Sequence, residues 1–366
     1  MMFLISILCF FSFLAVTVIA VDALQTFHTW QGRIHMGRWN DRWTWQKAVE
    51  SKCKSWLKHT PVIPVSDNDT YILYKKMTNK YGHHRVHSWQ YAGLLMGLDD
   101  CDAKDFVKSH HFLDNLSVDN AFLLYVLYKK HAVSKIDLQS FAIKLGLDSI
   151  DTTVPYNNNL PNVRFVDAIG MIVPFLYACG YKDKAMNQLK EYDEGFLNGI
   201  FPPHAYDIQK HLPMGIYDWS RGVGWYVLGI IETMELEGNC TRIIRLADEM
   251  LNFQRENGGF GCMLFSNSHL ESTGTALIGT LFVKAFELTN KDVFLNAAIS
   301  AEKALMQITR RNGEVDFAQG DTKGVGSYSL RFDTMPFAQG MALYLSKQIS
   351  CLQGDAKNGD ALDTVE

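Results

Sequence analysis

Apolar runs with helical spacing recur along almost the whole chain, and this repetition constrains its fold most strongly. In the run beginning Trp89-Gln-Tyr-Ala-Gly, apolar residues recur three and four positions apart, the spacing of one face of an α-helix. Comparable runs cover residues 89–98, 119–130, 166–179, 222–236, 273–288 and 336–348. Alternating apolar and polar residues, the pattern of a half-buried strand, are scarce. The sequence therefore predicts an all-α protein.

The six apolar runs lie roughly fifty residues apart, and amphipathic segments such as 182–191, 241–254 and 291–309 separate them. A buried helix is apolar on all sides, whereas a surface helix is amphipathic. We therefore expect six pairs of one inner and one outer helix, closed into an (α/α)6 toroid. An irregular helical bundle is the alternative. No Pro- or Ser-rich linker interrupts residues 24–350, so we expect one domain there, followed by a disordered tail over 351–366.

The first residues of the chain indicate the cellular compartment in which the protein acts. Residues 1–20 are almost wholly apolar, and small residues follow at Ala20 and Ala23, where a signal peptidase could cut. We expect residues 1–23 to be a signal peptide and the protein to be secreted or extracytoplasmic. An uncleaved membrane anchor is the alternative, because this segment lacks Lys and Arg and approaches spanning length. After signal cleavage we expect no membrane span.

The net charge and the cysteine spacing limit the classes of ligand and partner that the protein could bind. The 366 residues carry a formal net charge of −4 without a Lys/Arg cluster, which argues against a nucleic-acid partner. Six cysteines remain beyond residue 23, and no pair has C-x-x-C spacing, so disulfide pairing stays open. No Cys/His set has zinc-ligand spacing, and we expect no metal site. The sequence leaves the oligomeric state open.

Aromatic residues cluster where the apolar helices are expected to begin. Trp89 and Tyr91 start one run, and Trp219 and Trp225 flank the start of another. Aromatic rings beside polar groups suit the C–H faces of sugars, although a single Trp more often packs in a core. The number of such residues near helix starts favours a carbohydrate cleft formed at one end of the toroid.

Carboxylates at helix starts are the candidates for chemistry. Asp167 begins an apolar run, so it either stabilises the helix N-terminus or projects into the cavity as a general acid with a raised pKa. Asp114 and Asp119 precede another inner helix, and glycoside cleavage commonly uses two carboxylates. His204 and Arg221 add donors, and a guanidinium can bind both oxygens of a sugar carboxylate.

These segments together resemble glycoside hydrolase family 105, the unsaturated rhamnogalacturonyl hydrolases, and the related unsaturated glucuronyl hydrolases of family 88. The similarity runs from about residue 81 to residue 345, most of the mature chain. Its most specific parts are the run 166–175, His204-Ala-Tyr-Asp207, Trp219-Ser-Arg-Gly-Val-Gly-Trp225 and Glu271-Ser-Thr-Gly-Thr275. The resemblance implies an (α/α)6 toroid that removes a terminal 4,5-unsaturated uronic acid from oligosaccharides made by polysaccharide lyases.

The resemblance also implies roles for individual residues. Asp167 would be the catalytic acid and Asp114 the second aspartate, because Leu113-Asp-Asn-Leu is similar to the family's Leu-Asp-Asp-Ile pattern. The positions that look like sugar-binding ones are His204, Trp219, Arg221 and Trp225. The family's reaction hydrates the double bond, and the resemblance therefore implies neither a metal nor an organic cofactor.

Two departures from the family pattern leave the parent polysaccharide open. Val223 stands where the family usually has Asn, and the segment from His87 to Tyr91 differs from the usual W-x-Y form. Two alternatives accompany this interpretation. One is a sugar-binding relative without turnover, and the other is a toroid hydrolase that acts on saturated glycosides.

Overall fold

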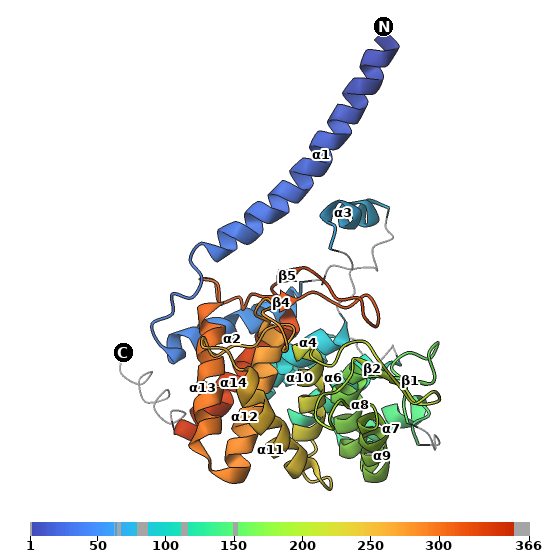
Figure 1. The fold of residues 1–366 in the computed structure, drawn as a ribbon, viewed down its shortest axis with the longest axis vertical. Coiled ribbons are helices and arrows are strands. Elements are labelled where there is room, and N and C mark those ends of the chain that lie inside the picture. Colours follow the sequence, from blue (N-terminus) through green and yellow to red (C-terminus); the bar gives the residue numbers. More distant parts are fainter. Residues whose placement is uncertain are drawn as a thin grey trace.

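A computed structural model describes residues 2–61, 63, 67–78, 87–110, 116–148 and 153–354 (Figure 1). Helices dominate these residues. The inner helices are α4 (Ser88–Gly97), α6 (Val118–Lys129), α8 (Val166–Cys179), α10 (Ser220–Ile231), α12 (Ser272–Thr289) and α14 (Pro336–Gln353). The outer helices are α2 (Arg42–Lys58), α5 (Asp100–Ser109), α7 (Lys135–Lys144), α9 (Lys182–Asp193), α11 (Asn239–Met250) and α13 (Asp292–Gln307).

The inner helices form a closed ring. Each packs against the next in chain order, from α4 through α6, α8, α10 and α12 to α14, and α14 returns to α4. Outer helices pack outside this ring; for example, α7 lies against α6 and α8, and α13 lies against α12 and α14. Every residue of α10 is buried, as expected for a helix surrounded by others. The predicted (α/α)6 toroid is therefore confirmed.

Glycines allow the ring to close where α14 meets α4. A β-carbon at Gly340 would lie 1.9 Å from the carbonyl oxygen of Gly93, and one at Gly93 would lie 2.4 Å from the ring of Phe337. Only a residue without a side chain fits at such a backbone contact. These two glycines therefore bring the first and last inner helices together.

Two predicted boundaries were wrong. Helix α10 ends at Ile231 instead of residue 236, and the chain turns over residues 232–238. Glu232 is the C-cap, and its carboxylate accepts hydrogen bonds from Lys129 and Tyr125 of α6. Helix α14 continues to Gln353 and ends at Gly354, whose φ of 75° suits a glycine C-cap. Residues 351–353 of the tail expected over 351–366 thus belong to this helix, and residues 355–366 lie outside the described part.

Two small sheets, which the periodicity did not predict, lie among the loops. Strands β1 (Val163–Phe165), β2 (Ala205–Asp207) and β3 (Leu212–Met214) pair antiparallel in that order. Strands β4 (Ala318–Gln319) and β5 (Phe332–Asp333) pair as a second sheet. Strand β1 runs directly into α8, and residues 320–331, the β4–β5 loop, precede α14. Both sheets therefore position residues near inner-helix N-termini.

The N-terminal helix α1 (Met2–Arg33) extends away from the toroid, with the short helix α3 (Asp69–Met77) beside it (Figure 1). Helix α1 is long and apolar enough to cross a membrane, and a signal sequence has the same properties. At its other end, Arg33 forms an ion pair with the buried carboxylate of Asp316. The seven cysteines all lie among the described residues and are unpaired there.

Candidate active site

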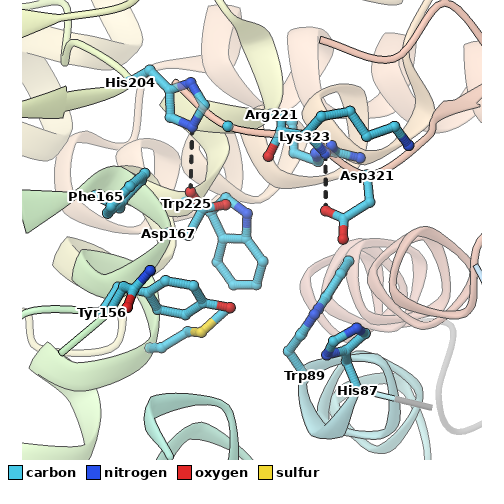
Figure 2. Close-up of a pocket in the computed structure, with 14 residues that line it drawn as sticks. His87, Trp89, Tyr156, Phe165, Asp167, His204, Arg221, Trp225, Asp321 and Lys323 are labelled. Carbon is cyan, nitrogen blue, oxygen red and sulfur yellow. Dashed lines mark hydrogen bonds and ion pairs between the residues drawn. The ribbon is translucent and has the colours of Figure 1, made fainter. Parts of the chain in front are cut away.

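A cavity of about 220 Å³ opens where the inner helices begin (Figure 2). Asp167 lies in the first turn of α8 and Arg221 in that of α10, while His87 is the N-cap residue of α4. His204 and residues 321–324 of the β4–β5 loop complete the polar wall. Side chains from five separate segments thus converge on a space suited to a small ligand.

Asp167 and Asp321 are the two carboxyl groups among the residues that line this cavity. The N-cap of α8 is Phe165, which offers no side-chain hydrogen bond, and the Asp167 side chain retains 21% of its exposure. Burial raises the pKa of Asp167 to about 7, Arg221 opposes this rise, and the negative charge of Asp321 adds to it. Asp167 therefore carries a proton up to about neutral pH, as a general acid must.

His204 lies directly over Asp167, with its Nε2 atom 3.9 Å from Oδ2 of the carboxyl group (Figure 2). The backbone fixes this arrangement, because the Val166 N–H donates to the His204 carbonyl at 3.0 Å and Phe165 pairs with Ala205 across the sheet. Burial, together with the positive charge of Arg221, lowers the pKa of His204 to about 4. His204 is therefore neutral at physiological pH.

Arg221 lines the cavity, but its guanidinium is already engaged. It donates hydrogen bonds to the backbone carbonyls of Gln319 and Gly320, and it is 2% exposed. These two bonds use only part of the five N–H donors of the guanidinium, so the binding of a sugar carboxylate by Arg221 stays a prediction. The two hydrogen bonds hold the start of the β4–β5 loop, and the guanidinium places a positive charge near Asp167.

Asp119, in the first turn of α6, does not itself line the cavity but contacts two residues that do. It accepts a hydrogen bond from the Tyr156 hydroxyl at 2.9 Å and lies 3.5 Å from Nδ1 of His87. Both partners line the cavity. Asp119 raises the pKa of His87 and, more weakly, that of Asp167. Asp114, the predicted second carboxylate, lies outside the described residues, so its place stays a prediction.

The predicted aromatic residues divide into two groups. Trp89 and Trp225 line the cavity and pack edge to face, with ring centroids 5.9 Å apart. Trp219 does not line it; this ring is buried behind His204, and its indole N–H donates to Gln319. Tyr91 does not line it either, because its ring packs against Phe106 of α5. Direct sugar contacts by Trp219 and Tyr91 are thus not supported.

Sequence reasoning missed several residues of the cavity wall. Tyr156 and Asn157 come from the loop before β1, and Asp321 and Lys323 come from the β4–β5 loop. These loops carry no periodic signal, and nothing in the sequence places them beside Asp167. A charged residue next to glycines, as at Lys323-Gly324, was the only available hint.

A larger groove of about 570 Å³ lies between the end of α1, residues 67–69 and the segment 330–333. Its cations are paired within the described part of the chain: Arg33 binds Asp316, and Arg331 binds Asp69 at 2.6 Å. Among its carboxylates, Asp67 has a lowered pKa, because burial is outweighed by hydrogen bonds from Ser329 and the Leu330 N–H. The smaller cavity is the candidate active site.

No protein-family model and no curated protein matches the chain. Among solved structures, an unsaturated glucuronyl hydrolase specific for heparin aligns with a TM-score of 0.61 and 13% identity, over 85% of this chain and 98% of that one. A Klebsiella pneumoniae structure, described as a possible member of glycoside hydrolase family 105, gives 0.55 and 16%, over 84% and 82%. A polysaccharide lyase gives 0.58 and 13%, over 83% and 98%.

These likenesses confirm, at the level of the fold, the resemblance to the two hydrolase families. All three identities are low, and one of the three structures is a lyase. A shared fold hosts different chemistries, so the activity has to be argued from the site.

Proposed function

We propose that the protein is a glycoside hydrolase that removes a terminal 4,5-unsaturated uronic acid from an oligosaccharide by hydrating the double bond. The observation that carries this proposal is a carboxylic acid, Asp167, whose pKa burial raises to about 7, in a cavity of about 220 Å³. A cavity of this size suits one terminal sugar ring and not the middle of a polymer, since pockets for larger ligands usually exceed about 300 Å³.

The reaction requires one well-placed proton. The C4–C5 double bond of the substrate is conjugated to the carboxylate and attached to the ring oxygen, so it is a vinyl ether. Asp167 donates its proton to C4, and the positive charge that develops at C5 is shared with the ring oxygen. Water attacks C5 and returns a proton to Asp167. The hemiketal opens and releases the remaining sugar as an alcohol, so one water molecule is consumed per turnover.

Asp119 is the second carboxylate in this proposal. Its hydrogen bond from Tyr156 and its contact with His87 place both polar groups at the cavity wall, where sugar hydroxyls would lie. Its negative charge also favours the protonated form of Asp167. Asp114 retains the role implied by the family pattern as a separate prediction. Trp89 and Trp225 supply the apolar surface for the ring.

A lyase is the competing function, because a lyase is among the proteins that share the fold. A lyase needs a base that removes a proton beside the carboxylate. Burial and the charge of Asp119 raise the pKa of Tyr156 well above its usual value, so its phenolate is scarce at neutral pH. Asp167, with its raised pKa, can supply the proton that hydration requires.

The protein acts on oligosaccharides outside the cytoplasm in this proposal, with residues 1–23 serving for export. The absence of a basic cluster along the sequence fits a short acidic substrate better than a long polyanion.

The experiment that tests the proposal follows the transferred proton. Turnover of an unsaturated uronyl disaccharide in D₂O should place one deuterium at C4 of the released keto acid, as read by NMR. Asp167→Asn should lower the rate by about two to four orders of magnitude while the protein stays folded. Products without deuterium at C4, or full activity in Asp167→Asn, would refute the hydration mechanism.

A further inference from the structure

Both ring nitrogens of His204 face a specific group. Nδ1 lies 3.0 Å from the hydroxyl of Tyr328, and Nε2 lies 3.9 Å from the carboxyl group of Asp167. The imidazole is only 2% exposed, so solvent has little influence on which nitrogen carries the proton. In neutral imidazole one nitrogen is a donor and the other an acceptor, and the hydrogen bond to one sets the state of the other.

Tyr328 has its own constraint. Its oxygen accepts a hydrogen bond from the backbone N–H of Ile216 at 3.4 Å, and an amide nitrogen can only donate. Gly215, with a φ of 79°, lets the backbone approach this closely, since a β-carbon there would lie 2.7 Å from the His204 side chain. Burial raises the pKa of Tyr328 to about 12, so the phenol keeps its proton and can donate it to Nδ1.

We propose that Tyr328 is a positioning residue that holds His204 in the tautomer with the proton on Nε2, directed at Asp167. The chain of donors runs from the Ile216 N–H to the Tyr328 oxygen, and from the Tyr328 hydroxyl to Nδ1. The consequence for catalysis rests on the role of Asp167 in the proposed function, whereas the tautomer itself does not.

The orientation matters for the proton of Asp167. An unprotonated Nε2 would present a lone pair that accepts a hydrogen bond from the carboxylic acid and directs its proton away from the substrate. A protonated Nε2 leaves the substrate as the acceptor, and it faces the carboxylate with an N–H once the proton has been transferred. Because the pKa of His204 is lowered to about 4, the imidazole stays neutral and does not compete as an acid.

The ring of Tyr328 also has a packing role that the hydroxyl does not share. Its centroid lies 5.3 Å from that of His204 and 5.4 Å from that of Trp219. Tyr328→Phe keeps this aromatic packing and removes only the hydroxyl. This variant therefore separates positioning through the hydrogen bond from simple support of the loop.

The test is a ¹⁵N NMR measurement of histidine tautomers on the full-length protein at pH 7. The protein has 12 histidines, and the His204 signals are identified by their loss in His204→Gln. We expect a protonated Nε2 and an unprotonated Nδ1 in the unaltered protein, and a mixture of tautomers in Tyr328→Phe. Tyr177→Phe, which removes a hydroxyl bonded to Glu235, is the control and should leave His204 unchanged. A proton on Nδ1 in the unaltered protein, or no change in Tyr328→Phe, would overturn the proposal.

Kinetics on an unsaturated uronyl disaccharide test the consequence separately. Tyr328→Phe should lower kcat by about tenfold, the factor expected for one ordinary hydrogen bond, with KM little changed. Its pH–rate profile should shift upward, because the ionised form of Asp167 loses a directed donor. An unchanged kcat and pH profile would remove the positioning role even if the tautomer changes. If the unaltered protein does not turn over the disaccharide, the proposed function fails while the NMR result still decides the tautomer.

Discussion

Asp167→Asn should make the protein more stable at neutral pH, although it removes the proposed catalytic acid. Burial raises the pKa of Asp167 from 3.8 to about 7 in the folded protein, so folding disfavours the charged form. Below pH 4 both the folded and the unfolded chain carry the neutral acid, and the amide of Asn resembles it in shape. As the pH rises from about 4 to about 7, the unfolded chain releases this proton while the folded chain retains it, and the folded protein loses stability.

The size of this effect follows from the two pKa values. They differ by about three pH units, and each unit corresponds to about 1.4 kcal/mol. The free energy of unfolding of Asp167→Asn should therefore exceed that of the unaltered protein by up to about 4 kcal/mol at pH 7 and above, by less than half of that at pH 5, and by almost nothing at pH 4.

Urea unfolding followed by circular dichroism from pH 4 to pH 8 measures the difference. Asp183→Asn, in the exposed first turn of the outer helix α9, is the matched control and should change the free energy of unfolding at pH 7 by much less. A pH-independent difference for Asp167→Asn, or a variant less stable than the unaltered protein at pH 7, would show that burial does not raise the pKa of Asp167 as described.

Three further predictions address the pH dependence and the fold. Since the protonated form of Asp167 is the active one, kcat/KM should fall about tenfold per pH unit above pH 7, and an activity that rises with pH would contradict its role. Lys129→Met leaves the buried carboxylate of Glu232 without its cation and should lower the free energy of unfolding in urea by about 3 kcal/mol. This value lies in the lower part of the range for a buried pair, because the Lys129 side chain is 34% exposed. A loss below about 1 kcal/mol would show that the pair contributes little to stability. Gly340→Ala places a methyl group against the backbone of α4 and should lower the free energy of unfolding by about 3 kcal/mol. Gly354→Ala, at the open end of α14, meets no neighbouring atom and should have a smaller effect. Equal effects of the two variants would refute the close contact between α14 and α4.

The sequence predicted the toroid well because its inner helices are buried on all sides, which gives them a continuous apolar signal. The boundary at Ile231 was missed because apolar residues continue the pattern at Met234 and Leu236, although the chain turns after Ile231. Asp167 was found through its place at the start of such a helix. Whether it capped that helix or served as an acid could not be decided from pattern, since burial and the charges of Arg221 and Asp321 fix its pKa.

The remainder of the site depends on loops that the pattern does not describe. Tyr328 lies 124 positions from His204 in the chain, and the two meet only because the β4–β5 loop brings Tyr328 against His204 and Ile216. Trp219 shows the opposite limit: its position at a helix start looked suited to sugar binding, but its indole is buried against Gln319. Residue type and spacing indicated the right region of the molecule, but they did not distinguish residues that line the cavity from residues that pack behind it.

Ultraviolet absorbance during incubation with lyase-made oligosaccharides tests the central claim most directly, because hydration and elimination change the conjugated double bond in opposite directions. The purified protein should remove the absorbance of unsaturated uronyl oligosaccharides at pH 6 and leave saturated analogues untouched, and Asp167→Asn should show almost no loss of absorbance. An increase of absorbance with saturated polysaccharide would identify a lyase, and no change with any unsaturated uronyl substrate would contradict the proposed hydrolase.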